Sequence, residues 1–155
     1  MTKDLEHKTR YRMCVAYDGA AYSGWQTQPN HRTIQGELER VLLELTSQKE
    51  RIHCSGRTDA GVHAREQVVH FDLAAPIVPK KLQLGFNALL EPDIRVLSIR
   101  KAAADFHARF AAKGKEYRYF IYNADILLPF LRNYRAHVRM KLDVEAMNKA
   151  AKLLV

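Results

Sequence analysis

Two kinds of hydrophobic periodicity follow each other along the first hundred residues and most constrain the fold. Residues 10–18 alternate with period two, which is typical of a strand with one buried face. Residues 33–45 instead carry one apolar stripe at helical spacing. Two strand patterns, a second helical stripe and a last strand pattern follow at 51–54, 67–73, 79–90 and 94–99. This βαββαβ order predicts an α+β ferredoxin-like domain, with an antiparallel sheet and both helices on one face.

Local signals sharpen the expected elements. Thr33 is a suitable N-cap for the first helix, and Pro79 can open the second. The first strand should bury one face, formed by Tyr11, Met13, Val15 and Tyr17. In the last strand, simple alternation places Ile94, Val96 and Ser98 on one face and Arg95, Leu97 and Ile99 on the other.

The pattern changes after Lys101. Short strands are expected at 106–110, 115–122 and 134–141, followed by a final helix capped by Asp143. The apolar stripe of that helix runs to the chain end without a Gly or Pro stop signal, so we expect the front part of a longer protein. The expected organisation is a leader at 1–9, a ferredoxin-like domain at 10–104 and the incomplete beginning of a second α+β domain at 105–155.

Charge points to a polyanionic partner. The chain carries a net charge of +8, and residues 95–141 hold 11 Lys and Arg against 3 Asp and Glu, a surplus of 8. Aromatic residues are interleaved with these charges, among them Phe106, Phe110, Tyr117, Tyr119, Phe120, Tyr122 and Tyr134. This combination is typical of nucleic-acid-binding surfaces; the alternative is a basic surface over core aromatics. No apolar run suits a membrane span, and no signal region precedes residue 12. Cys14 and Cys54 lack metal-type spacing, which favours a cytoplasmic protein with free thiols.

The segment Ser55-Gly56-Arg57-Thr58-Asp59-Ala60-Gly61-Val62-His63 is the strongest candidate for chemistry. A carboxylate on a tight glycine-flanked loop, beside cationic groups, is a plausible nucleophile or base. Asp-Ala-Gly is also good turn chemistry, so Asp59 has a purely structural alternative in which it bonds its own backbone. The loop at 20–32 is long for a compact domain, and its Trp25 either forms an ordered binding surface or covers the edge of the core.

Several motifs together resemble the TruA family of tRNA pseudouridine synthases. The opening Tyr17-Asp18-Gly19, Gly24-Trp25-Gln26 and Thr33-Ile34-Gln35 is similar to that family's opening, and 56–64 resembles its catalytic motif. The similarity continues, in order, through Gln67-Val68-Val69-His70-Phe71, Asn87-Ala88-Leu89-Leu90, Asp93-Ile94, 105–110 and 115–119.

This resemblance implies isomerisation of uridine to pseudouridine in the anticodon stem-loop of tRNA, without cofactor or metal. The aspartate that matches Asp59 acts as nucleophile on ribose C1′ or base C6, or assists through a glycal intermediate. The arginine that matches Arg57 helps hold the target nucleotide outside the stack. The tyrosine that matches Tyr117 lies against the uracil and is a proposed proton acceptor. The resemblance also implies a homodimer and a chain of over 200 residues with a cleft between two halves.

Further contacts to RNA are expected from basic and aromatic residues. His63 and His107 either bond phosphate or support the loop. Basic side chains are candidates for phosphate contacts, although each also has the alternative of an ordinary surface charge: Arg65, Lys80, Lys81, Arg109, Lys113, Lys115 and Arg118. No histidine forms a metal-type pair with another ligand. The alternative function is a non-catalytic RNA-binding module or an inactive half-enzyme, but 115–120 lacks the glycine-aromatic signature of an RRM.

Overall fold

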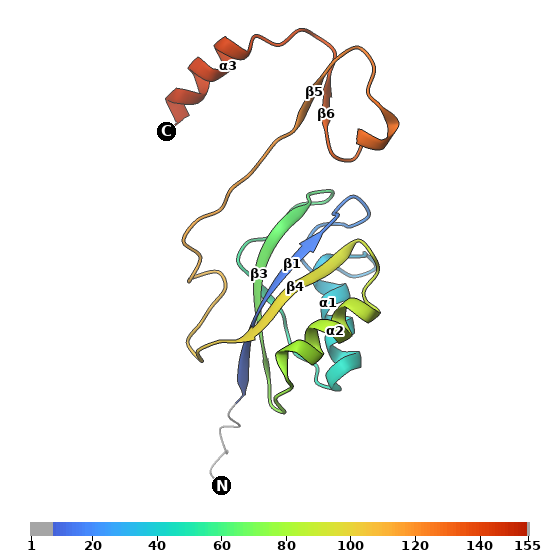
Figure 1. The fold of residues 1–155 in the computed structure, drawn as a ribbon, viewed down its shortest axis with the longest axis vertical. Coiled ribbons are helices and arrows are strands. Elements are labelled where there is room, and N and C mark those ends of the chain that lie inside the picture. Colours follow the sequence, from blue (N-terminus) through green and yellow to red (C-terminus); the bar gives the residue numbers. More distant parts are fainter. Residues whose placement is uncertain (1–7, 155) are drawn as a thin grey trace. The chain divides into compact units, whose positions relative to one another are not determined.

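The computed structural model describes residues 8–154, which form two compact units (Figure 1). Unit 1 extends to Lys113 and unit 2 begins at Gly114, whereas the sequence-based boundary was placed after residue 104. The expected leader falls largely outside the described residues, and Thr9 already belongs to the first strand. In the part of the chain that is described, no helix has the length and apolar character needed to cross a membrane.

Unit 1 is the expected ferredoxin-like domain. Its strands are β1 (Thr9–Tyr17), β2 (His53–Cys54), β3 (Ala64–Leu73) and β4 (Ile94–Lys101). They form one sheet in the order β2-β3-β1-β4, in which all neighbours are antiparallel. The helices α1 (Ile34–Thr46) and α2 (Pro79–Leu89) lie on the same face of this sheet (Figure 1). The predicted α+β fold class is therefore confirmed, with β1 in the interior of the sheet.

The core lies between the sheet and the two helices. The alternation in β1 is confirmed, because Tyr11, Met13, Val15 and Tyr17 are all buried. Both helix starts are also as expected: the Thr33 side chain accepts a hydrogen bond from the Gly36 backbone, and Pro79 occupies the first turn of α2. The other buried apolar side chains come from both helices, their flanking loops and the sheet, including Ile34, Leu38, Leu42, Ile52, Val69, Phe71, Leu73, Leu82 and Phe86.

A β-bulge corrects the predicted faces of β4. Cys14 pairs with Ser98 but Val15 pairs with Val96, so Leu97 is an extra residue in the ladder. The alternation changes phase there: Ile99 is 9% exposed and joins the core, whereas Leu97 is 45% exposed. The prediction that Leu97 and Ile99 share a face was therefore wrong.

Residues 102–113 do not form the strand expected at 106–110. They make turns, with the Phe106 amide bonded to the Ala103 carbonyl at 3.0 Å and the Ala111 amide to the His107 carbonyl at 2.8 Å. Tertiary contacts hold this segment on the sheet: Arg10 donates to the Phe106 carbonyl at 2.9 Å, and the Ala108 amide donates to His70 Nδ1 at 3.2 Å. These contacts satisfy backbone groups that a strand would have paired.

Unit 2 contains little regular structure. Its strands β5 (Ile121–Asn123) and β6 (Ala136–Val138) are parallel and shorter than the expected 115–122 and 134–141. A 3₁₀ turn at Pro129–Leu131 lies between these two strands in the chain, and α3 (Val144–Ala151) is capped by the side chain of Asp143, as expected. A last 3₁₀ turn spans Lys152–Leu154. None of the described residues 114–154 is buried, so this unit has no core of its own.

Candidate active site

Asp59 begins a tight turn in the loop between β2 and β3. Its backbone carbonyl accepts a hydrogen bond from the Val62 amide at 3.2 Å, and Gly61 has a φ of +78°. A positive φ at the third position is the requirement of a type II turn and explains why glycine stands there. The predicted turn chemistry is thus present, but it uses the backbone of Asp59 rather than its carboxylate.

The side chains of Asp59 and Arg57 are exposed. Within residues 8–154, neither side chain makes a hydrogen bond or an ion pair. The Asp59 carboxylate does not bond its own backbone, which was its structural alternative, and it forms no salt bridge with Arg57. The loop therefore exposes the Asp59 carboxylate and the Arg57 guanidinium, two residues apart in the sequence, and both are available to bind a ligand.

The remainder of this loop is held firmly at its base. Gln67 on β3 is 8% exposed; it accepts a hydrogen bond from the Ser55 hydroxyl at 2.7 Å and donates one to the Gly56 carbonyl. Two residues later, the Thr58 hydroxyl lies 2.9 Å from the Tyr17 hydroxyl. A buried amide and a buried phenol thus fix the chain on the approach to Asp59.

The segment 19–25, which follows β1, packs directly on the Asp59 loop. The Trp25 amide donates to the Thr58 carbonyl at 2.9 Å, and the Gly61 amide donates to the Tyr22 carbonyl at 3.3 Å. Gly24 has a φ of +85°, and a Cβ there would lie 2.8 Å from the Thr58 carbonyl oxygen. These backbone contacts lie on both sides of Asp59 and require glycine at the point of closest approach.

Asp93, just before β4, holds the same segment through a second set of contacts. Its carboxylate accepts from the Tyr22 hydroxyl at 2.6 Å and pairs with Arg32 at 3.1 Å, while its carbonyl accepts from the Asp18 amide at 2.8 Å. Burial and the Asp93 hydrogen bond both raise the pKa of Tyr22, so its hydroxyl remains a donor. Arg32 also lies 4.3 Å above the Tyr22 ring.

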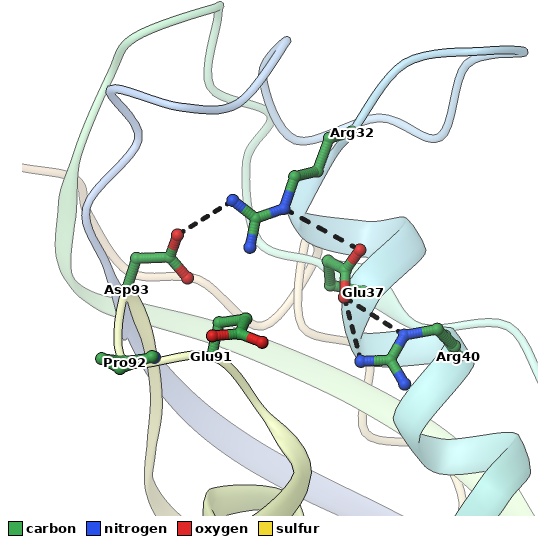
Figure 2. Close-up of a pocket in the computed structure, with 6 residues that line it drawn as sticks. All are labelled: Arg32, Glu37, Arg40, Glu91, Pro92 and Asp93. Carbon is green, nitrogen blue, oxygen red and sulfur yellow. Dashed lines mark hydrogen bonds and ion pairs between the residues drawn. The ribbon is translucent and has the colours of Figure 1, made fainter.

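An open pocket of about 610 Å³ lies beside this anchor. Figure 2 shows that its charged side chains are largely paired with one another: Arg32 with Asp93 and Glu37, and Glu37 with Arg40. These ion pairs neutralise the charges that a polar ligand would need. We therefore interpret the pocket as a solvent-filled surface depression beside Asp93 and not as a ligand site.

His63 supports the loop end. Its Nδ1 lies 3.1 Å from the Gly19 amide and 3.0 Å from an Asp18 carboxylate oxygen. A neutral Nδ1 accepts from Gly19, whereas a protonated one donates to Asp18. Of the two expectations for His63, loop support is thus the one for which the structure supplies contacts.

His107 lies in an aromatic cluster on β2 and β3. Its ring centroid is 4.5 Å from that of His70 and 4.4 Å from that of Phe110, and His53 stacks on His70 at 4.9 Å. Burial, reinforced by the two neighbouring imidazoles, lowers the pKa of His70 to about 4. Among the described residues, no three His, Cys, Asp or Glu side chains are arranged to hold a metal ion.

Trp25 is not a binding surface in this structure. It is 1% exposed, and its ring lies 6.2 Å from that of Tyr17. Such a buried indole offers no face to a nucleotide, so the expected RNA contact by Trp25 is wrong and its core alternative holds.

The other predicted site residues are exposed and are divided between the two units. Arg65, Arg109 and Lys113 belong to unit 1. Tyr117, Lys115 and Arg118 belong to unit 2, where Tyr117 is 67% exposed and Arg118 pairs with Glu116. Tyr117 is therefore neither in a strand nor in a core, and its side chain is accessible.

Sequence reasoning missed the residues that hold the loop. The sequence pattern places Tyr17 in the core and Thr58 in the Asp59 loop, and it involves Gln67 and Asp93 only in the family resemblance. The available signal was a polar residue at an inward position of β3, since Gln67 alternates with Val69 and Phe71.

The fold and site together define a class: a ferredoxin-like domain that presents an aspartate on a glycine-bearing loop at one end of its sheet. Residues 13–111 match the model of the tRNA pseudouridine synthase family, and the chain belongs to that family.

Curated relatives are similar over nearly the whole chain. The chain is 45% identical over 148 residues to tRNA pseudouridine synthase A of Listeria innocua, which covers 95% of this chain and 60% of that protein. It is 49% identical over 143 residues to the enzyme of the same name from Halalkalibacterium halodurans, covering 92% of this chain and 54% of that protein. This chain thus spans about 60% or less of the length of these relatives.

Proposed function

We propose that the protein isomerises uridine to pseudouridine in tRNA, with Asp59 as its catalytic carboxylate. One observation carries the proposal: the loop is fixed on both sides of Asp59, while the carboxylate itself is exposed and has no partner among residues 8–154. A structural aspartate would be expected to use its carboxylate in that scaffold. The family of the chain and the names of its relatives support the same reaction.

The chemistry needs a group that bonds and leaves again. Isomerisation breaks the bond between ribose C1′ and uracil N1 and forms one between C1′ and C5, and the proton on C5 is transferred to N1. A carboxylate suits attack on C1′, addition at C6, or assistance through a glycal. Negative charge develops on the detached uracil, and a nearby cation such as Arg57 stabilises it.

The target base must first leave the stem-loop. Extrusion costs a few kcal/mol and requires planar side chains that hold the base. Arg57 and Tyr117 are exposed and of suitable types, so we assign them to this step, with Tyr117 as the proton acceptor. Exposed basic side chains are assigned to phosphates: Arg65, Arg109, Lys113, Lys115 and Arg118.

For the intact protein, we infer the site of action on tRNA, the location and the oligomeric state from the family. We propose that the intact protein acts in the anticodon stem-loop, as a cytoplasmic homodimer and without a cofactor. The aromatic residues of unit 2 support a nucleic-acid partner, because Tyr117 and Tyr119 are 67% and 88% exposed.

Asp59→Asn tests the catalytic assignment. In the natural protein that carries this sequence, the variant keeps the size of the side chain and removes the nucleophile. Pseudouridine formation on unmodified tRNA should fall at least about 10³-fold while tRNA affinity changes by less than about threefold. Asp125→Asn, an exposed aspartate of unit 2, is the matched control and should retain full turnover. Turnover of Asp59→Asn within tenfold of the wild type would refute the assignment.

The exposed basic and aromatic residues also fit a non-catalytic RNA-binding module. That alternative predicts tRNA binding without turnover in the wild-type protein, so the wild-type arm of the same assay separates the two functions.

A further inference from the structure

We propose that Tyr17 is a positioning residue for Asp59, acting through the hydrogen bond between its buried hydroxyl and Thr58. The inference rests on the proposed catalytic role of Asp59 and concerns a residue that does not touch the substrate. Under this proposal the Tyr17 ring packs in the core, and its hydroxyl in addition fixes the position of the Asp59 loop.

Tyr17 is a rigid platform. It is the last residue of β1, an interior strand paired with β3 and β4, and its side chain is 4% exposed. The ring packs near Trp25, with centroids 6.2 Å apart. A tyrosine has two χ angles, and burial on both sides fixes them, so the hydroxyl is held at one point at the end of the sheet.

The Tyr17 hydroxyl contacts Thr58, the residue immediately before Asp59. The Tyr17 and Thr58 hydroxyl oxygens are 2.9 Å apart, and the Thr58 carbonyl accepts from the Trp25 amide at 2.9 Å. Thr58 is therefore anchored through its side chain and its backbone. Since a threonine Cβ is branched, a bonded hydroxyl fixes χ1 and with it the direction in which the chain enters Asp59.

The chain leaving Asp59 is anchored independently. The Gly61 amide bonds to the Tyr22 carbonyl, and the Val62 carbonyl oxygen lies so close to Gly19 that a Cβ there would come within 2.0 Å of it. The residues on both sides of Asp59 are thus anchored, which restricts the backbone that carries the carboxylate. Loss of the Tyr17–Thr58 bond releases one flank, and a displacement of about 1 Å at a reacting group can cost 10²-fold in rate.

Burial also keeps the phenol in its useful form. It raises the pKa of Tyr17, so the hydroxyl remains protonated throughout the working pH range. A phenylalanine would retain the ring packing but leave the Thr58 hydroxyl without this partner.

The test is a double-mutant cycle in the natural protein that carries this sequence. Tyr17→Phe and Thr58→Val each remove one of the two hydroxyl groups that form the bond. Thr58→Ser keeps a hydroxyl group at residue 58. Tyr11→Phe is the matched control, because Tyr11 lies on the same face of β1 and is also buried, and its hydroxyl bonds the Ile77 backbone at 2.8 and 2.9 Å. Single-turnover rates at saturating tRNA, dissociation constants and melting temperatures are measured for each variant.

We expect Tyr17→Phe and Thr58→Val each to slow the single-turnover rate about 10- to 100-fold, with tRNA affinity changed by less than about threefold. Thr58→Ser should retain the rate within about threefold, and the double variant should be no slower than the slower single variant. Tyr11→Phe should lower the melting temperature without lowering the rate.

Three results would overturn the proposal. The Tyr17→Phe enzyme could react as fast as the Tyr11→Phe enzyme, or the rate losses of the two single variants could multiply in the double variant. The third result is that Tyr17→Phe fails to fold while Tyr11→Phe folds. If Thr58→Val fails to fold, the comparison of the two tyrosine variants decides. Asp59→Asn is run alongside. An active Asp59→Asn enzyme refutes the proposed function itself, whereas an inactive one with a fully active Tyr17→Phe enzyme refutes only the positioning role.

Discussion

At the residue scale, glycines determine how closely two loops approach each other. Gly24 and Gly61 share a left-handed backbone, with φ of +85° and +78°, but differ in surroundings. A Cβ on Gly24 would lie 2.8 Å from the Thr58 carbonyl oxygen, whereas a Cβ on Gly61 would meet no described residue other than its chain neighbours within 4 Å. Substituting these two glycines therefore separates the stability cost of backbone strain from that of a steric clash.

Gly24→Ala should destabilise unit 1 by about 2–4 kcal/mol, because left-handed strain and overpacking add. Gly61→Ala carries the strain alone and should cost about 1–2 kcal/mol. Urea unfolding of the 155-residue chain, followed by the fluorescence of its single tryptophan in unit 1, measures both. Equal losses would show that the 19–25 segment is not packed on the Asp59 loop as described.

The His70 imidazole links stability to pH. It is 3% exposed and faces His53, His107, Arg10 and Asp72. Its pKa is lowered to about 4, so as pH falls the unfolded chain takes up the proton first, near pH 6.5. The contribution of His70 is therefore fully present above pH 6.5 and lost progressively between pH 6.5 and 4.

Unfolding free energies measured between pH 7.5 and 4 should consequently fall by up to about 3 kcal/mol on account of His70. His70→Asn keeps an acceptor for the Ala108 amide and removes the titration, so its profile should be flatter. A variant profile with the same slope as the wild type would assign the pH dependence to other groups.

At the element scale, the bulge in β4 decides which side chains the strand buries. Val96 is also bonded by the Asn87 side chain, which donates to its carbonyl and accepts from its amide, both at 2.9 Å. An amide from α2 thus occupies the outer edge of β4 next to the bulge and satisfies groups that another strand would bind.

Ile99→Ala should cost about 2–4 kcal/mol and Leu97→Ala less than about 0.5 kcal/mol, because only Ile99 lies in the core. Simple alternation from Ile94 predicts the opposite ranking, so the two variants compare bulged and regular strands directly. Tryptophan fluorescence in urea gives both values, and a larger loss for Leu97→Ala would exclude the bulge.

Elements with a local cause were predictable from the sequence. Alternation identified the buried face of β1, and Thr33, Pro79 and Asp143 marked helix starts through their own backbone chemistry. The bulge at Leu97 and the turns at 106–110 were not predictable, because they depend on pairing with β1 and on contacts from His70 and Arg10. The Asp59 loop stands out in the sequence through its glycine-flanked motif, but the contacts that Tyr17 and Tyr22 make with this loop are tertiary and could not be predicted.

At the scale of the whole molecule, the two units differ in what stabilises them. Unit 1 buries a continuous core between one sheet and two helices. Unit 2 buries none of its described residues, and the apolar stripe of α3 is open to solvent, with Val144 61% and Met147 45% exposed. Most helical stability in proteins comes from packing an apolar face, so α3 of eight residues is marginal in this arrangement.

Hydrogen exchange should separate the units in this chain. Amides of β1 and β3 should exchange at least about 100-fold more slowly than those of α3, because opening them requires unfolding of the core. A chain of residues 1–113 alone is the matched control and should keep the same protection, since every residue of that core belongs to unit 1. Equal protection of α3 and β1 would mean that unit 2 buries its stripe. If that protection also rose with protein concentration, the partner on α3 would be a second copy of the chain.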